Sequence, residues 1–194
     1  MLYRPSKGKM KDDFIVYYEG RYYMFCMYGP DIDRYNAVWL ATSEDGVHWR
    51  DYGVVIEAPF VVWAMAILRI NDRFVMNHGS FTDKGVQGVL KQWESYDLLH
   101  WSYLGEEYDI LPPPDIEDAR IDHMAVIREE ERGETVYYGY PASPYTVLRS
   151  KDGVKWDFIG TADQCIDWGD VPPTLVEAKD APLETGAAMK IGDT

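Results

Sequence analysis

Cysteine is scarce in this chain: Cys26 and Cys165 are the two that occur among 194 residues. Two isolated cysteines provide neither a disulfide framework nor the ligand spacing of a metal site. Cys26 lies in the apolar run 24–27 and is predicted to be a small buried side chain. We therefore expect a fold that depends on its core, with no metal and no other cofactor.

Long apolar runs and positive charges are scarce as well. No apolar stretch reaches about 18 residues, so no transmembrane helix is predicted, and residues 1–10 lack the features of a secretory signal. Lys and Arg number 19 against 33 Asp and Glu, and the net charge of −14 argues against nucleic acid and anionic membrane surfaces as partners. The prediction is a soluble protein, either cytoplasmic, or secreted or periplasmic after removal of a signal.

Helical periodicity is missing too. No long segment repeats its apolar residues with the period of about 3.6 that a surface helix requires. Short runs of β-branched and aromatic residues, which strands prefer, instead flank three predicted hairpin turns. These turns are Glu19-Gly20, Asn71-Asp72 and Arg132-Gly133. The predicted fold class is all-β.

A repeated motif divides the chain into units. The pattern Ser-x-Asp-x-x-x-Trp occurs at 43–49, 95–101 and 150–156, and its tryptophans are 52 and 55 residues apart. A repeat of about 40 to 50 residues is typical of β-propellers. The Asp-Gly pair in two of the motifs is a hairpin turn signal. We expect Trp49, Trp101 and Trp156 to pack between units.

Each unit reads as four strands, which is one propeller blade. The predicted four-stranded antiparallel blades are 10–57, 62–109 and 120–163, followed by an incomplete one at 184–194, all in a single domain. About three and a half blades leave strand edges open, whereas propellers close with about four to eight. We expect either that C-terminal blades are missing, which we favour, or that the ring closes in a homo-oligomer.

Acidic residues stand before the first strand of three units. They are Asp12, Asp122 and Glu184, while the second unit has Trp63 at the corresponding place. If the units are arranged radially, these side chains converge on one funnel, and converging carboxylates carry out glycoside hydrolysis. Sequence leaves nearby acids open as alternatives, namely Asp13, Asp118 and Glu177.

The layout resembles the five-bladed propeller glycoside hydrolases, the clan of arabinanases, xylosidases, invertases and levansucrases. In that clan an Asp-Pro opens the first inner strand, and here Asp12-Asp13 precedes the run 14–18. The third blade has Asp122-His123 where Asp-Pro is usual, and the fourth has Glu184-Thr185-Gly186. The resemblance covers nearly the whole chain, but the absent prolines indicate a divergent member.

The resemblance implies a role for each acid. Asp12 would be the nucleophile or base, Glu184 the general acid with a raised pKa, and Asp122 the residue that orients the sugar and keeps Glu184 protonated. The separation of the carboxyls would decide between retention and inversion of the anomeric centre. The implied partner is a carbohydrate substrate.

Other residues are candidates for binding that substrate. Trp63 could stack on a sugar ring, and Arg120 and His123 flank Asp122. His78 could bind a hydroxyl, although a structural hydrogen bond is the commoner role of such a histidine. Two alternatives to hydrolysis stay open: a glycoside phosphorylase, which would need a cluster of Arg and His for phosphate, and a non-catalytic propeller that binds carbohydrate or protein.

Overall fold

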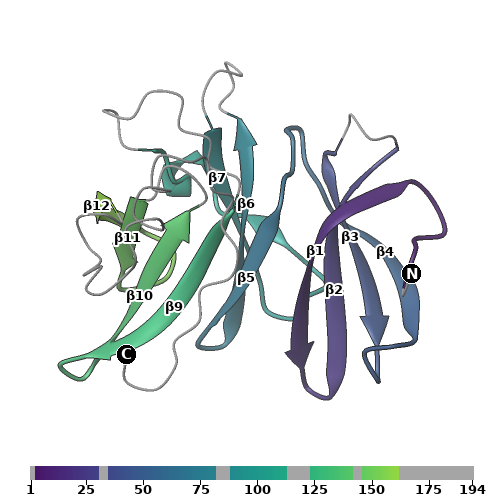
Figure 1. Ribbon diagram of the computed structural model, residues 1–194, viewed down its shortest axis with the longest axis horizontal. Coiled ribbons are helices and arrows are strands. Elements are labelled where there is room, and N and C mark those ends of the chain that lie inside the picture. Colours follow the sequence, from purple (N-terminus) through teal and green to yellow (C-terminus); the bar gives the residue numbers. More distant parts are fainter. Residues whose placement is uncertain (1–2, 31–34, 82–87, 113–122, 142–145, 162–194) are drawn as a thin grey trace, which may run out of the picture.

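The computed structural model describes residues 3–30, 35–81, 88–112, 123–141 and 146–161 (Figure 1). Within these ranges the protein is all-β, with twelve strands in three four-stranded antiparallel sheets and one short 3-10 helix at Glu106–Tyr108. The predicted fold class and the four-stranded units are therefore confirmed for the described residues. The predicted fourth unit, 184–194, lies outside them.

Each sheet is a meander in which consecutive strands are neighbours. The first sheet contains β1 (Lys9–Tyr18), β2 (Arg21–Gly29), β3 (Ala37–Ser43) and β4 (Trp49–Glu57). The second contains β5 (Met65–Ile70), β6 (Arg73–Phe81), β7 (Gly88–Ser95) and β8 (Ser102–Tyr103). The third contains β9 (Met124–Glu131), β10 (Glu134–Pro141), β11 (Thr146–Ser150) and β12 (Asp157–Thr161).

The first strands of the three sheets are neighbours in space. β1 contacts β5, and β5 contacts β9. In Figure 1 the hairpins β1–β2, β5–β6 and β9–β10 all lie at the lower end, so the three inner strands run in the same direction. We call the opposite end, where β1, β5 and β9 begin, the strand-start end.

The three predicted hairpins are present, and their backbone explains their sequences. Glu19 and Gly20 have φ of 48° and 80°, and Arg132 and Gly133 have φ of 53° and 83°. Two consecutive residues with positive φ form the tight turn whose twist matches that of the flanking strands. Asn71 has φ of 57°, a conformation that asparagine tolerates better than most residues.

The Ser-x-Asp motif forms the turn between the last two strands of each sheet, as its Asp-Gly pair in the first and third sheets predicts. In the first sheet, residues 44–48 make a five-residue connection between β3 and β4. The backbone of this longer turn is satisfied by side chains: the Ser43 hydroxyl accepts from the N–H of Gly46 at 2.9 Å, and the Asp45 carboxylate accepts from the N–H of His48 at 2.7 Å. Ser95 with Asp97 and Ser150 with Asp152 repeat these bonds.

Leu98 occupies the position that glycine holds in the other two motifs. Its φ is 65°, against 73° for Gly46 and 71° for Gly153. A left-handed conformation costs a residue with a Cβ roughly 1–2 kcal/mol. Leu98 is fully buried in the core between the first and second sheets, and burying a leucine contributes about 1.5–3 kcal/mol. Burial therefore offsets the backbone strain.

We expect the replacement of Asp97 by alanine to destabilise the protein by about 1 kcal/mol at neutral pH, because backbone N–H groups of the turn lose their acceptor. Partial burial favours neutral Asp97, but bonds from the His100 ring and from the N–H groups of His100 and Leu99 outweigh it and hold the pKa below its usual range. The contribution is thus present above about pH 4 and falls as pH drops towards the lowered pKa. Urea denaturation between pH 7 and pH 3 should show the two proteins converging; a constant difference would contradict this.

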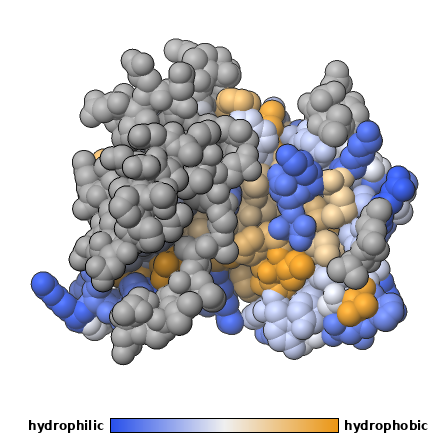
Figure 2. Space-filling model, viewed as in Figure 1, coloured by the Kyte–Doolittle hydropathy of each residue, from blue (hydrophilic) through white to orange (hydrophobic). Residues whose placement is uncertain are grey.

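Apolar side chains fill the spaces between sheets. The larger core, between the first and second sheets, includes Phe25, Leu40, Phe74 and Met76. Figure 2 shows apolar residues gathered near the middle of the face in view. Trp101 belongs to this core, with its ring edge-on to Phe25 at 5.7 Å.

Two of the repeated tryptophans pack as predicted and one does not. Trp156 packs between the second and third sheets, as Trp101 does between the first and second. Trp49 instead lies on the far face of the first sheet, beside Met24 and the fully buried Cys26. The burial of Cys26 was predicted, and it raises the pKa of the thiol to about 12, with Asp13 adding to the effect.

Candidate functional site

Three of the predicted site residues lie at the strand-start end. Asp12 is in β1, Trp63 precedes β5 by two residues, and His123 directly precedes β9. Since β1 neighbours β5, β5 neighbours β9 and all three run in the same direction (Figure 1), the three strands begin at the same end of the molecule. The predicted acids Asp122 and Glu184 lie outside the described residues, as do Arg120 and the alternatives Asp118 and Glu177.

Asp12 occupies a β-bulge. The β1–β2 register passes from Lys11 opposite Met27 to Asp13 opposite Cys26, so Asp12 is an extra residue in β1. Its φ is 47°, its side chain is 41% exposed, and its carboxylate lies 3.7 Å from the Lys11 ammonium. We expected Asp12 just before its strand, but β1 begins three residues earlier, at Lys9. Bulges re-aim side chains and are common next to active sites, and backbone strain concentrates there as well.

The bulge also separates Asp12 from its alternative, Asp13. Asp13 pairs with Cys26 and, by the alternation of a strand, shares a face with Ile15 and Tyr17. That face points away from the second sheet, because Phe14 and its neighbours on the other face pack in the core between the two sheets. Of the two carboxylates, Asp12 is the one whose backbone departs from the regular ladder.

Trp63 is held in place by its own connection. In the segment between β4 and β5, the N–H of Val62 donates to the Tyr35 carbonyl and the N–H of Trp63 donates to the Gly79 carbonyl, both at 2.9 Å. The indole is half-buried against the core between the first two sheets, and its ring lies edge-on to that of Phe81, with centroids 4.3 Å apart. Trp63 therefore stands at the strand-start end in a defined orientation.

His78 does not fit the substrate-binding role that we considered for it. Its side chain is fully buried, Nδ1 is 2.8 Å from the carbonyl of Gly79, and Nε2 accepts from Nε1–H of Trp93 at 3.0 Å. Both ring nitrogens are occupied, so neither can bind a sugar hydroxyl. Burial lowers the pKa of His78 to about 4, which keeps the ring neutral. His78 is the structural hydrogen-bonding residue that was the alternative interpretation.

A second polar group, which the sequence did not indicate, lies beside His78. Lys91 is opposite His78 in the β6–β7 ladder, and its ammonium lies 2.6 Å from the Asp109 carboxylate. The Tyr103 hydroxyl donates to the same carboxylate at 2.7 Å, and the Lys91 ammonium lies 4.8 Å from the centre of the Phe60 ring. The two charged side chains are only 5% and 10% exposed. This buried pair supports the segment that carries Trp63.

Asn77 links the second sheet to the start of β9. Its side chain is 3% exposed, and its Oδ1 accepts from the backbone N–H of Met124 at 3.1 Å. Met124 is the first residue of β9, next to His123 and two positions after Asp122 in sequence. No local pattern could have revealed this contact, because the two residues are 47 positions apart.

The replacement of Asn77 by leucine, which has a similar shape, should lower the free energy of unfolding by about 1–3 kcal/mol. The cause is the Met124 N–H, which would stay buried without an acceptor. Asn77→Asp keeps an acceptor for this hydrogen bond, but it also buries a carboxyl group, which has a cost of its own. Thermal and urea denaturation of both variants would measure the effect, and an unchanged stability of the leucine variant would contradict the role of this bond.

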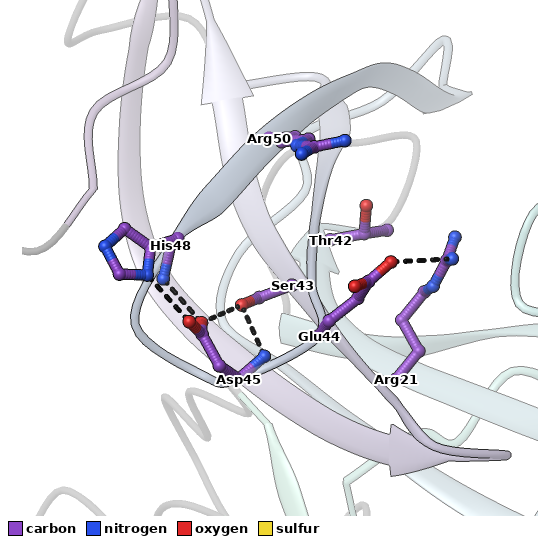
Figure 3. A pocket seen from close by; sticks show the side chains of 7 residues that line it. All are labelled: Arg21, Thr42, Ser43, Glu44, Asp45, His48 and Arg50. Carbon is purple, nitrogen blue, oxygen red and sulfur yellow. Dashed lines mark hydrogen bonds and ion pairs between the residues drawn. The ribbon is translucent and has the colours of Figure 1, made fainter.

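A surface cavity lies at the other end of the molecule and is not the candidate site. It has a volume of about 190 Å³ and is lined by Arg21, Thr42, Ser43, Glu44, Asp45, His48 and Arg50 (Figure 3). Its carboxylates are engaged within the turn: Glu44 pairs with Arg21 at 3.6 Å and Asp45 with His48 at 2.6 Å. They stabilise the motif at the hairpin end of the first sheet.

The described residues contain neither a metal-binding cluster nor a membrane-spanning helix. No three His, Cys, Asp or Glu side chains in the described part of the chain are grouped so that they could hold a metal ion. Among the same residues, no helix is long and apolar enough to cross a membrane.

Several of the solved structures that this chain resembles are hydrolases of fructose-containing sugars. No protein-family model matches the sequence. The β-fructofuranosidase of Bombyx mori, of family GH32, matches with a TM-score of 0.63 and 15% identity, over 81% of this chain and 36% of that protein. The fructan 1-exohydrolase IIa of Cichorium intybus matches with a TM-score of 0.63 and 18% identity, over 81% of this chain and 33% of that protein. The sucrose-6-phosphate hydrolase of Lactobacillus gasseri matches with a TM-score of 0.62 and 17% identity, over 82% of this chain and 36% of that protein.

The chain shares its fold with a part of each of these hydrolases. The predicted resemblance to the five-bladed propeller clan is thereby confirmed at the level of the fold. In sequence, the levanbiose-producing levanase of Bacillus subtilis (strain 168) is 41% identical over 54 residues, which are 27% of this chain and 10% of that protein. The chain spans only about a third of the length of these three structures.

Proposed function

We propose that this protein is a glycoside hydrolase that acts on a sugar or oligosaccharide, and that fructosides are its substrates. The observation that carries the proposal is the exposed, bulged Asp12 on the innermost strand of a fold shared with fructoside hydrolases. Related structures were solved in complex with sucrose, 1-kestose and fructosylnystose. Sugars of these kinds are the first substrates to test.

The proposed mechanism uses two carboxylates and a third supporting one. Asp12 is the nucleophile or base, and Glu184 is the general acid that protonates the leaving oxygen. Asp122 orients the sugar and keeps Glu184 protonated through repulsion between like charges. Trp63 forms part of the wall against which the sugar packs, and Arg120 and His123 bind its hydroxyls.

The test is incubation of the protein with sucrose, 1-kestose and levan, followed by chromatography of the products. Release of free fructose that does not depend on phosphate supports hydrolysis. Formation of a sugar phosphate that requires added inorganic phosphate would instead identify a phosphorylase. Binding of the sugars in calorimetry without any turnover would identify a non-catalytic carbohydrate-binding propeller.

A further inference from the structure

We propose that Phe81 is a positioning residue for the sugar-binding wall: it fixes the Trp63 indole, and the two rings together form an aromatic corner that recognises the apolar face of a furanose. This inference rests on the proposed function and adds to it a residue and a form of recognition.

The contact between the two rings is close and nearly perpendicular. Their centroids are 4.3 Å apart and their planes are inclined by 77°. This edge-to-face arrangement is the one that the charge distribution of aromatic rings favours. It is the shortest centroid separation among the described aromatic pairs. Because the Phe81 ring is packed against the indole, it limits the rotamers that Trp63 can adopt.

The backbone holds both residues at the strand-start end. Trp63 is tied to β6 by its hydrogen bond to the Gly79 carbonyl, and Phe81, the last residue of β6, pairs with Gly88 of β7. The ladder therefore fixes the spacing of the two side chains. The corner lies on the second sheet, whose inner strand contacts both β1, which carries Asp12, and β9.

Exposure distinguishes Phe81 from the rest of its strand. The seven residues from Phe74 to Ser80 are all buried, whereas Phe81 is 39% exposed and Trp63 is half-buried. The pair thus presents aromatic surface to solvent while Trp63 stays anchored in the core. A rigid, partly exposed ring is suited to the C–H face of a sugar, since little side-chain entropy is lost on binding. The perpendicular partner restricts the orientation of the sugar on that face.

The experiment compares Phe81→Ala and Phe81→Tyr with wild type. Calorimetry with sucrose and 1-kestose gives the affinity, and the hydrolysis assay gives KM and kcat. We expect Phe81→Ala to raise Kd and KM by about 3- to 10-fold, the effect of losing one aromatic pair, with a smaller change in kcat, and Phe81→Tyr to retain wild-type values. Phe158→Ala, which removes an exposed phenylalanine of β12, is the matched control and should change neither.

A second measurement does not depend on sugar binding. The near-ultraviolet circular dichroism signal lost in Trp63→Phe identifies the contribution of this indole, and Phe81→Ala should weaken the same band. An unchanged band in Phe81→Ala overturns the positioning role. If wild type binds the sugars and Phe81→Ala binds them equally well, the positioning role is overturned, while the proposed function stands. If wild type binds neither sugar, the proposed function fails, and this inference fails with it.

Discussion

Replacement of Asp12 by asparagine is expected to lower kcat/KM for fructoside hydrolysis by about 10²- to 10⁴-fold, the usual contribution of a positioned acid or base. Asparagine keeps the shape of the side chain and tolerates the left-handed conformation of the bulge, where φ is 47°. The fold should therefore persist while the reactive carboxylate is lost. Initial rates with sucrose, together with a thermal melt of the variant, would measure both.

Asp13→Asn is the matched control. Asp13 neighbours Asp12 and has the same chemistry, but it lies in the regular ladder opposite Cys26, on the face turned away from the second sheet. Its replacement should leave hydrolysis close to wild type. If Asp13→Asn abolished activity while Asp12→Asn did not, the assignment of the first acid would be reversed. If both variants were fully active, the two-carboxylate proposal would lose its nucleophile or base.

Truncation of Asp109 to alanine should be the most destabilising single change considered, with a loss of about 3–5 kcal/mol. The carboxylate is the partner of the Lys91 ammonium at 2.6 Å, and the side chains are 5% and 10% exposed for Lys91 and Asp109. Removing one member of a buried pair leaves the other charge without compensation in a medium of low polarity. Tyr103 would also lose the acceptor of its hydroxyl hydrogen bond. Urea denaturation at neutral pH would measure the loss.

Two comparisons separate this effect from the general cost of removing a charge. Glu134→Ala breaks an ion pair with Lys151 whose side chains are 69% and 70% exposed, and it should cost less than about 1 kcal/mol. The double variant Lys91→Met with Asp109→Leu replaces the buried pair by apolar side chains and should recover much of the stability. A loss below about 1 kcal/mol for Asp109→Ala would mean that the pair is hydrated and contributes little.

The fold could be predicted because its signals are local. Hairpins such as Glu19-Gly20 require a backbone that few residue types adopt, and a motif repeated about every 50 residues reveals a stack of similar units. The turn at residues 44–48 was predicted from its Asp-Gly pair, and its length of five residues has a local cause as well. The Ser43 and Asp45 side chains accept bonds from the turn N–H groups, and so a longer connection is stable.

The site was less accessible to sequence reasoning, because its geometry depends on contacts between distant segments. From sequence, a histidine at the end of an apolar run is equally compatible with an exposed and a buried side chain. The hydrogen bond from Trp93 to His78 shows that this one is buried and structural. The bulge at Asp12 results from a register shift against β2, and the Asn77–Met124 bond joins two sheets. The placement of Asp122 and Glu184 stays a prediction.

The strained backbone of Leu98 has a consequence for how the protein folds. Its φ of 65° belongs to a turn of the second sheet, but the burial that offsets the strain is supplied by the interface with the first sheet. A second sheet formed alone would bear the strain without that compensation. The turn therefore reaches its lowest free energy only when the two sheets have docked, so local structure and interface form together. We infer that these two sheets unfold in a single cooperative transition.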